Sequence, residues 1–513
     1  MSDSLKMFKL YDIRTKHQNL SSEEAERVIA AIARYYKESV KVSSVYVARD
    51  ARLYCAELLD KAVEVFSRYG IEVYFNPVQI STCQFYYSCM QNRDGGGLMI
   101  TASHNPSEYV GFKLVGRDVS PIAMDCGPDG GLEQVRRNYI ENLPVPTTDT
   151  PAKVHVAQYQ KEYVAYSMRL AGVKPGDLAG MRIFGEFLAG TAGTDFAMAM
   201  DLAGARYTLH HPVPNGFFPY GNPNPIEETS IAVARELVRS GSYDLGVCYD
   251  GDGDRMDLMY PNGEQIIPGL NISLLVPYIK EIFKPYFGEN YPFKAFVDVK
   301  AIPLSLIEIS RAGIEQHIIR NGHSYIKEKL KEYQQEGYLV SEEESSHYYM
   351  NFPFDPDDLS KGFAATENTL FFTLLTARAL KENKAGYQRI FQLQKGIFRY
   401  REWPLYFNVY EAMDGIMADV ENAMCERGAA VIKEMDDGSD LDAALMRFSL
   451  PAHIGADTQF PESWCQVAQR ISRSEDAMTR WEVVASDQAL CDEMNGVIRR
   501  IADSYVEKGI AHY

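Results

Sequence analysis

Residues 45–75 read VYVARDARLYCAELLDKAVEVFSRYGIEVYF. An apolar run at 45–47 is followed by apolar residues at helical spacing across 58–66, and then by a second β-rich run at 71–75. This alternation continues along most of the chain and is typical of α/β proteins, in which strands and helices take turns. We therefore expect an α/β fold.

Proline-rich and turn-rich stretches predict where the domains end. The passage LPVPTTDTP at 143–151 cannot sustain a helix or a central strand, so it is expected to be a connector. The turn YPNG at 260–263 closes a predicted strand pair and marks a second boundary, and after Pro404 the composition becomes more helical and acidic. Near the end of the chain, apolar residues at spacings of three and four predict one buried helix face; they are Leu490, Met494, Val497, Ile501 and Tyr505.

The charge balance limits the partners of this protein. Subtracting 70 acidic residues from 52 Lys and Arg in 513 residues leaves a net charge of −18. A general binder of nucleic acid or of anionic membranes needs a cationic surface, so we expect neither partner. No export signal or membrane span is visible, and the eight cysteines include no CxxC pair, which favours free thiols in the cytoplasm.

A serine-bearing segment, LMITASHNPSE at 98–108, combines an apolar strand with small and polar residues. The pattern predicts Ser103 at the end of a strand, with Pro106 in the first turn of a following helix. A serine in such a crevice, where helix N-terminal amides can hold an anion, suits a covalent phosphoryl carrier. The alternative is a serine that caps the helix.

A second segment, DGDGDR at 250–255, lies between two apolar runs and is expected to form a tight loop between two strands. Asp250, Asp252 and Asp254 alternate with glycines, so their carboxylates can converge on one hard cation, which points to Mg²⁺. A calcium-binding EF-hand would need Gly at its sixth position and Glu at its twelfth, where this chain has Arg255 and Pro261. The alternative to a metal loop is a solvated turn.

A third segment, EEESSH at 342–347, follows another apolar run. Carboxylate and hydroxyl groups together can recognise sugar hydroxyls, although a charge run is commonly a solvated surface. Because the protein as a whole is anionic, an anionic substrate would need a local concentration of positive groups. Candidates near the motifs are Arg14, Lys113, Lys300 and His323.

In this order, TASHNP at 101–106, DGDGDR at 250–255, NGHS at 321–324 and EEESSH at 342–347 closely resemble the α-D-phosphohexomutase family, and the phosphomannomutase/phosphoglucomutase branch most. The resemblance covers about residues 8–480. It implies three related α/β domains and a smaller C-terminal α+β domain around a central cleft. We expect these domains at 1–150 with the phosphoserine loop, 151–268 with the metal loop, 269–398 with the sugar loop and 399–513 with a phosphate-binding loop.

The same resemblance implies an isomerase that moves a phosphoryl group between the 1- and 6-hydroxyls of mannose or glucose. By the same resemblance, such an enzyme would require Mg²⁺ and a hexose 1,6-bisphosphate that serves as activator. The implied metal site comprises Ser103, Asp250, Asp252 and Asp254. The implied catalytic residues are Ser103, His104, Lys113, Arg14 and Arg255. The implied contacts to the hexose phosphate are Tyr11, Lys300, His323, Glu343, Ser345, Arg470, Ser472 and Ser474.

The chain departs from its relatives at the phosphate loop of the last domain, where they carry an RPSGTEP-like sequence. Its best match is RISRSED at 470–476, in which Arg473 replaces a glycine and Arg480 on the next strand is a further cation. Ser346 also stands where the sugar loop usually has glycine, and residues 430–465 look like an addition. Three alternatives stay open: a phosphoglucosamine mutase, a degenerate paralogue that binds a sugar phosphate without turnover, and a phosphoserine hydrolase.

Overall fold

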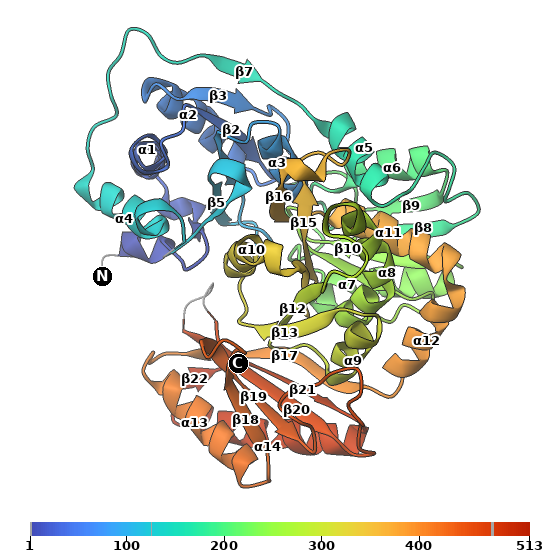
Figure 1. Ribbon diagram of the computed structural model, residues 1–513. Coiled ribbons are helices and arrows are strands. Elements are labelled where there is room, and N and C mark those ends of the chain that lie inside the picture. The colour runs from blue at the N-terminus through green and yellow to red at the C-terminus, as the bar shows by residue number, and fades with distance from the viewer. Residues whose placement is uncertain (1–2, 125, 473–476) are drawn as a thin grey trace.

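The computed structural model describes residues 3–124, 126–472 and 477–513, and the strands within these ranges form four sheets (Figure 1). In the described residues, the first three sheets are mixed and covered by helices, whereas the fourth is antiparallel and packs against α13 and α14. This arrangement confirms the expected fold class.

The first sheet contains the buried strand β2, whose apolar residues face helices on both sides, as the alternation at 45–75 predicts. Its order is β1-β5-β4-β2-β3-β7, with β6 on β5. The strands are β1 (Ile13–Lys16), β2 (Ser44–Arg49), β3 (Glu72–Phe75), β4 (Gly96–Ile100), β5 (Tyr109–Val115), β6 (Pro121–Ile122) and β7 (Val154–Val156). The helices are α1 (Ser22–Tyr35), α2 (Cys55–Arg68), α3 (Thr82–Met90) and α4 (Leu132–Glu141).

The second and third sheets share one continuous core. The second is β11-β10-β8-β9 and the third is β13-β12-β14-β15-β16. Their strands are β8 (Arg182–Glu186), β9 (Arg206–His210), β10 (Leu245–Tyr249), β11 (Met256–Met259), β12 (Lys294–Asp298), β13 (Glu315–Ile319), β14 (Tyr338–Glu343), β15 (His347–Pro353) and β16 (Phe363–Glu367). Their helices are α5 (Gln160–Leu170), α6 (Gly193–Ala203), α7 (Glu228–Ser240), α8 (Pro268–Phe287), α9 (Pro303–Arg311), α10 (His323–Glu332), α11 (Thr369–Glu382) and α12 (Lys384–Gln394).

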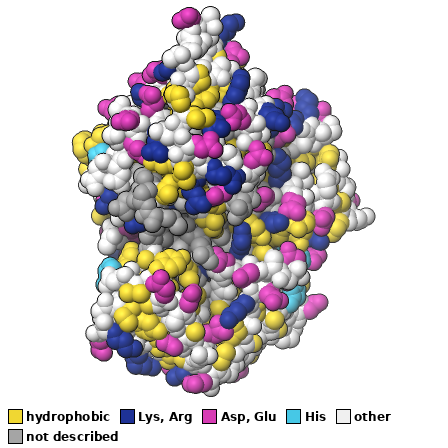
Figure 2. All heavy atoms as spheres, turned by 90° about the vertical axis from the view of Figure 1, so that its left-hand side faces the viewer, with side chains coloured by type: hydrophobic (Ala, Val, Ile, Leu, Met, Phe, Trp, Pro, Cys, Tyr) yellow, Lys and Arg dark blue, Asp and Glu magenta, His cyan; other side chains and the backbone are white. Residues whose placement is uncertain are grey.

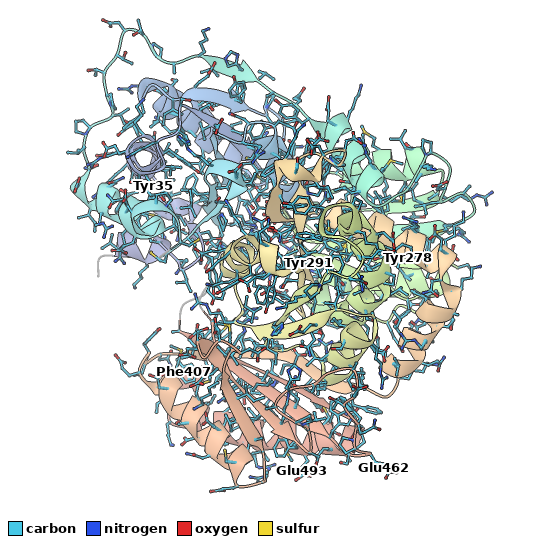
Figure 3. The ribbon with its side chains drawn as sticks, in the orientation of Figure 1. Tyr35, Tyr278, Tyr291, Phe407, Glu462 and Glu493 are labelled. Carbon is cyan, nitrogen blue, oxygen red and sulfur yellow. The ribbon has the colours of Figure 1, made fainter. Side chains whose placement is uncertain are left out.

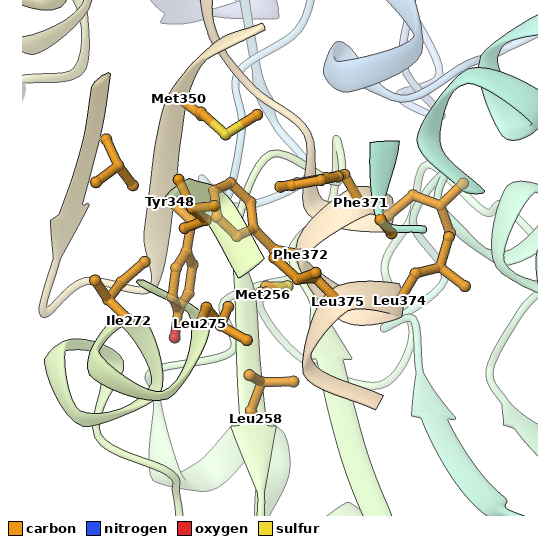
Figure 4. Close-up of a cluster of buried hydrophobic side chains, with 14 of the residues drawn as sticks. Met256, Leu258, Ile272, Leu275, Tyr348, Met350, Phe371, Phe372, Leu374 and Leu375 are labelled. Atoms are coloured by element: carbon orange, nitrogen blue, oxygen red, sulfur yellow. The ribbon is translucent and has the colours of Figure 1, made fainter. Parts of the chain in front are cut away.

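Figure 4 shows how this shared core is built. In this view Tyr348 of β15 lies between Ile272 of α8 and Phe372 of α11, and its ring centroid is 5.3 Å from that of Phe372. Met256 of β11 belongs to the same cluster. These side chains are almost completely buried. Because burying each large apolar side chain contributes roughly 1.5–3 kcal/mol, this cluster fixes the second sheet against the third.

The fourth sheet has its own core between one sheet face and α13 and α14. In Figure 3, Phe407 marks this unit, while Tyr35 of α1 marks the separate core of the first sheet. The order is β18-β19-β20-β21-β17-β22. The elements are β17 (Phe398–Phe407), α13 (Ala412–Cys425), β18 (Ala430–Glu434), β19 (Asp440–Phe448), β20 (Cys465–Ile471), β21 (Met478–Ala485), α14 (Gln488–Glu507) and β22 (Ala511–His512).

Two local predictions are confirmed. Residues 143–153 carry no helix or strand and are mostly exposed, as expected of a connector. Helix α14 buries Met494 and Val497, and Leu490, Ile501 and Tyr505 pack against the same core. Asp487 caps the helix by accepting a hydrogen bond from the Leu490 N–H at 2.9 Å.

One local prediction is wrong. No helix begins at Pro106 in the described residues: after β4 the chain makes two turns and returns as the antiparallel strand β5. The residues that follow, YVGFKLV, include the β-branched or aromatic residues Tyr109, Val110, Phe112 and Val115, and the strand pairs in a sheet that buries all but Tyr109. Sheet pairing therefore outweighs the helix-starting tendency of the proline.

Candidate active site

A cavity of about 910 Å³ lies between loops from all four sheets. It brings together many of the residues expected from the sequence. Those that line the cavity directly are Tyr11, Arg14, His104, Arg255, His323, Glu343, Ser345 and Arg470. Beneath this layer lie the buried groups Ser103, Lys113, Asp250, Asp252, Asp254 and Lys300. Asn222 and Asn224 of an NPNP segment also line the cavity, and sequence reasoning missed them.

The Ser103 loop follows β4 and is held in a rare backbone conformation. Ser103 has φ 51°, which a residue with a side chain adopts only when its surroundings impose it. Its N–H donates to Thr101 Oγ1 at 2.9 Å, and its hydroxyl donates to Asp250 Oδ2 at 3.1 Å. His104 Nδ1 is 3.3 Å from the same hydroxyl oxygen. The serine hydroxyl is thus directed at a metal-loop carboxylate and at an imidazole.

Arg52, which the sequence analysis missed, holds this loop in place. Its guanidinium is completely buried and donates to the carbonyls of Ser103 at 2.7 Å and Asn105 at 2.6 Å. It also donates to the carbonyls of Pro106 and Tyr109 and pairs with Asp50 at 3.1 Å. The only sequence signal for this role is a charged RDAR stretch at 49–52, directly after a buried strand.

The aspartate loop joins β10 to β11, as predicted, and its three carboxylates are buried within 4.8 Å of one another. Gly253 has φ +72°, so the loop needs glycine there. A Cβ on Gly251 would lie 2.9 Å from the Ser103 carbonyl oxygen. This glycine therefore allows the metal loop to approach the serine loop closely.

The three carboxylates have the donor set for a divalent cation. Lys113 Nζ donates to Asp252 Oδ2 at 2.9 Å and to Asp254 Oδ2 at 2.5 Å, but the Oδ1 atoms of Asp252 and Asp254 are buried and accept no hydrogen bond. An unsatisfied buried carboxylate oxygen is costly unless a cation or donor meets it. Oxygen ligands of this kind fit Mg²⁺.

Burial and neighbouring charges shift the pKa values of Asp250 and Asp254 in opposite directions. Burial and the neighbouring Asp252 and Asp254 raise the pKa of Asp250 well above its usual value. Burial also acts to raise the pKa of Asp254, but Lys113 and Arg255 outweigh it and lower that pKa. Burial similarly acts to lower the pKa of Lys113, yet the two carboxylates raise it, so Lys113 is an ammonium ion at neutral pH.

His347 joins this group and was missed as a site residue, although it ends the quoted EEESSH segment. Its Nε2 accepts a hydrogen bond from Arg255 Nε at 2.8 Å, and its Nδ1 lies 3.7 Å from Glu367 Oε1 and 4.0 Å from Asp254 Oδ1. Burial and then the Arg255 charge lower the pKa of His347 well below its usual value. Because Nε2 accepts, the neutral ring carries its proton on Nδ1.

The sugar-loop residues sit at the turn between β14 and β15. Glu343 Oε1 accepts from Asn321 Nδ2 at 2.5 Å, and Oε2 accepts from the Tyr349 hydroxyl. Ser345 faces the cavity. Ser346 has φ +70°, a left-handed conformation that glycine adopts more readily, and its hydroxyl donates to Asp257 at 2.9 Å.

Residues from the first and third sheets meet at the cavity wall. Arg14 donates to Asn105 Oδ1 at 2.7 Å and pairs with Asp12. The Tyr11 hydroxyl donates to the Asn321 carbonyl at 2.8 Å, and its ring contacts the His323 ring edge-on at 5.6 Å between centroids. The N-terminal YDIR segment and the NGHS segment are thus neighbours.

The C-terminal phosphate loop is described in part. Arg470 and Ser472 are described, whereas Ser474 and Arg473 lie outside the described residues. Ser472 is buried and follows β20. Arg470 makes a two-pronged ion pair with Glu402, with Nε–Oε1 at 2.7 Å and NH2–Oε2 at 2.9 Å. Lys300, which follows β12, pairs with Asp298 at 3.2 Å. Glu402 was not expected at the site.

A further group of metal-ligand residue types lies at the ends of β8 and β9. Glu186 is buried, with Oε1 3.1 Å from His211 Nδ1 and Oε2 2.5 Å from His210 Nδ1. Its Oε1 also accepts from the Leu188 N–H at 2.8 Å. The carboxylate is satisfied by these groups, so we assign it a structural role.

Comparisons with known proteins agree with this geometry. Two family models match, namely phosphoglucomutase/phosphomannomutase alpha/beta/alpha domain I at residues 5–126 and domain II at residues 161–263. A phosphomannomutase of Escherichia coli is 28% identical over 361 residues, which cover 68% of this chain and 74% of the relative. A phosphoglucomutase of Neisseria meningitidis is 26% identical over 365 residues, covering 68% and 72%.

Solved structures share the fold. A phosphoglucomutase/phosphomannomutase family protein of Burkholderia thailandensis superposes with TM-score 0.73 at 19% identity, over 98% of each chain. An Aspergillus fumigatus N-acetylphosphoglucosamine mutase, solved with GlcNAc-6P and magnesium, superposes with TM-score 0.57 at 12% identity, over 97% of this chain and 95% of that one. The surface in Figure 2 mixes acidic, basic and apolar side chains. Among the described helices, none is long and apolar enough to cross a bilayer.

Proposed function

Because this chain belongs to the phosphoglucomutase/phosphomannomutase family, we propose that it interconverts the 1-phosphates and 6-phosphates of glucose or mannose. The observation that carries the proposal is the position of the Ser103 hydroxyl, which lies 3.1 Å from Asp250 Oδ2 in a group of three buried carboxylates. The adjacent cavity is lined by Arg14, Arg255 and Arg470. A nucleophilic hydroxyl, a metal site and phosphate-binding cations around one cavity are what phosphoryl transfer needs.

In the proposed reaction, phospho-Ser103 gives its phosphoryl group to the free hydroxyl of a hexose phosphate. The bond between Ser103 Oγ and phosphorus breaks as the sugar oxygen bonds to phosphorus. Ser103 Oγ takes up a proton and the sugar hydroxyl loses one, which yields free Ser103 and a hexose 1,6-bisphosphate. After the sugar turns around, its other phosphoryl group returns to Ser103. A hexose 1,6-bisphosphate added in trace would phosphorylate Ser103 and so act as activator.

Charge on the transferring group would be offset by Arg255, whose charge acts on His104 beside Ser103, and by Lys113, which contacts Asp252 and Asp254 of the metal loop. Bound Mg²⁺, held by Asp250, Asp252 and Asp254 with an oxygen of Ser103, would withdraw electron density from the phosphoryl oxygens. Lys113, as an ammonium ion, can give a proton to a leaving oxygen.

His104 can handle the proton of Ser103. Its Nδ1 lies 3.3 Å from Ser103 Oγ, and burial together with Arg255 and Arg14 lowers its pKa well below the usual value. A neutral imidazole can accept the serine proton when phosphate returns to Ser103.

The remaining residues would bind the substrate. Glu343 and Ser345 would accept and donate hydrogen bonds to sugar hydroxyls, since both reach the cavity. The distal phosphate would contact residues from three sheets, namely Tyr11, Lys300, His323, Arg470, Ser472 and Ser474.

We also propose that the four sheets correspond to four domains, at 1–150, 151–268, 269–398 and 399–513. Strand β7 follows the first of these boundaries but pairs with β3.

The experiment is to measure kcat/KM for glucose 1-phosphate, mannose 1-phosphate and glucosamine 1-phosphate, with Mg²⁺ and a trace of the matching bisphosphate. We expect turnover of the glucose or mannose compound, and loss of turnover in Ser103→Ala. Near wild-type turnover in Ser103→Ala would contradict the phosphoserine mechanism. Release of free phosphate without isomerisation would indicate a hydrolase instead, and turnover of glucosamine 1-phosphate alone would indicate the phosphoglucosamine branch.

A further inference from the structure

Glu402 lies where three cations meet. Arg470 binds it through two N–H donors, and Arg480 NH1 donates to Glu402 Oε2 at 3.1 Å. Lys300 Nζ, from the third sheet, lies 3.7 Å from Glu402 Oε1. The Glu402 side chain is only 8% exposed. We call Lys300, Arg470 and Arg480 the cation cluster.

The fourth sheet explains why a carboxylate is present there. Arg470 of β20 and Arg480 of β21 are direct cross-strand partners, and like charges at such positions repel each other. Strand β17, next to β21, has a register shift between Tyr400 and Trp403, and Glu402 lies within it. Such a bulge redirects a side chain, here onto the two arginines.

Two buried carboxylates contact the cation cluster. Its three positive charges face Glu402 and the buried Asp298, which pairs with Lys300 at 3.2 Å. Burial acts to raise the pKa of Glu402, but Arg470, Lys300 and Arg480 outweigh it and hold that pKa well below its usual value. Glu402 is therefore ionised throughout the physiological range, and it presents a negative charge to the N–H donors of the cation cluster.

We propose that Glu402 is the resident anion of the distal phosphate site: it holds the cation cluster in position between substrates and competes with a bound phosphoryl group for the same N–H donors. This inference rests on the proposed function, because it takes the ligand of Arg470 to be a phosphoryl group. Glu402 is a positioning residue, since it acts through the cations.

The competition has a use in a mutase. The proposed bisphosphate must release one phosphate from this site and present the other, so an unopposed triple cation would hold the dianion too tightly to let it turn. With Glu402 present, the arginines regain a carboxylate partner as the phosphate leaves. Glu402 thereby lowers the free energy needed to release the phosphate. It also keeps the three cations in position to bind the next phosphate.

The test is the affinity of inorganic phosphate, measured by titration calorimetry without Mg²⁺, for wild type and Glu402→Gln. We expect Glu402→Gln to bind phosphate about tenfold tighter, equivalent to about 1.4 kcal/mol. Glu402→Asp keeps the negative charge, so its affinity for phosphate should stay within about twofold of that of wild type. Glu108→Gln removes a carboxylate from the same cavity but not from the cluster, so it should not change the affinity. Equal or weaker binding in Glu402→Gln would overturn the proposal.

Two additions make the result specific. When Arg470→Gln is present in both proteins, the difference in phosphate affinity between Glu402→Gln and its parent should become smaller, because Arg480 and Lys300 still contact Glu402. An undiminished difference would contradict the inference. If Glu402→Gln does not fold, as judged by thermal unfolding, Glu402→Ser is used, and added acetate should then compete with phosphate. Turnover assays give a second readout. Because the distal phosphate should bind more tightly and leave more slowly, Glu402→Gln should lower both KM and kcat for the hexose phosphate. Because phosphate binding needs no turnover, a protein without mutase activity could still confirm the role of Glu402.

Discussion

A single buried arginine determines the shape of the Ser103 loop. Four backbone carbonyls of the loop accept hydrogen bonds from Arg52, which also pairs with Asp50. Guanidinium geometry matters here, because its five N–H donors in one plane can serve several acceptors at once, whereas an ammonium group is a point donor. The unusual φ of Ser103 persists because these contacts oppose its relaxation.

We therefore predict that Arg52→Met lowers the free energy of unfolding by about 3–5 kcal/mol, since it leaves Asp50 and the carbonyls buried without a partner. Turnover should fall by more than tenfold, and Arg52→Lys should recover only part of either loss. Thermal unfolding and kcat measure the two effects. Arg206→Met, at an exposed position of β9, is the control and should change neither. An Arg52→Met protein as stable as the control would refute this role.

At the scale of elements, the β10–β11 hairpin gathers like charges that a divalent cation can neutralise. A ligand that binds only the folded state stabilises it, by about 2.7 kcal/mol at a concentration one hundred times its Kd. We predict that Mg²⁺ raises the unfolding temperature of wild type above that in EDTA, and that Asp252→Asn loses most of this increase. Asp257→Asn, on β11 but outside the trio, should keep it. An Asp252→Asn protein that responds to Mg²⁺ as wild type does would contradict the site.

Helix α6 carries a buried acid in its first turn that makes stability depend on pH. Burial raises the pKa of Asp195 from 3.8 to about 7, against the opposing hydrogen bonds from Gln160 and Ser81. Between pH 4 and 7 the folded protein keeps a proton that the unfolded chain releases, so stability falls as the pH rises through this window. The full effect of about three pKa units corresponds to roughly 4 kcal/mol.

Asp195→Asn imitates the protonated acid, so we expect it to unfold several degrees above wild type at pH 8 and close to wild type at pH 4.5. Unfolding temperatures at the two pH values give the comparison. Asp201→Asn changes an exposed acid on the same helix and should follow wild type at both. If Asp195→Asn gained nothing at pH 8, the raised pKa would be wrong.

At the scale of the whole molecule, Arg399 joins the third sheet to the fourth. It lies between Glu344 of the sugar loop, at 3.2 Å, and Glu482 of β21, at 3.3 Å. Burial raises the pKa of Glu344 to about 7, and it also raises the pKa of Glu482. The guanidinium opposes both shifts, so its removal would leave two buried carboxyl groups that resist ionisation.

We predict that Arg399→Met lowers the unfolding temperature more at pH 8 than at pH 6, because the two acids can stay neutral only at the lower pH. KM for the hexose phosphate should rise, since the sugar loop loses its contact with the fourth sheet. Adding Glu482→Gln to Arg399→Met should restore part of the stability at pH 8. A loss that is equal at both pH values would argue against a charge-based interface.

The local parts of this protein could be predicted from sequence because they depend on neighbours in the chain. Strand and helix alternation, the strand-loop-strand at Asp250–Asp254 and the buried face of α14 follow from periodicity and turn residues. The prediction failed at Pro106, where pairing of β5 with β4 and β1 decided the conformation. Local preference is weaker than burial in a sheet.

Only the tertiary structure showed which distant groups complete the site. Arg52 acts on a carbonyl 51 residues away, His347 accepts from Arg255 over 92 residues, and Glu402 binds Arg470 over 68. Arg52 and Glu402 stand in no pattern that marks them as site residues, because a charged residue beside a strand is usually solvated. His347 ends the EEESSH segment, but that segment does not show that Arg255 is its partner. What makes them partners is burial: in a medium of low polarity each charge must find its counterpart, and that depends on which chain segments the fold places together.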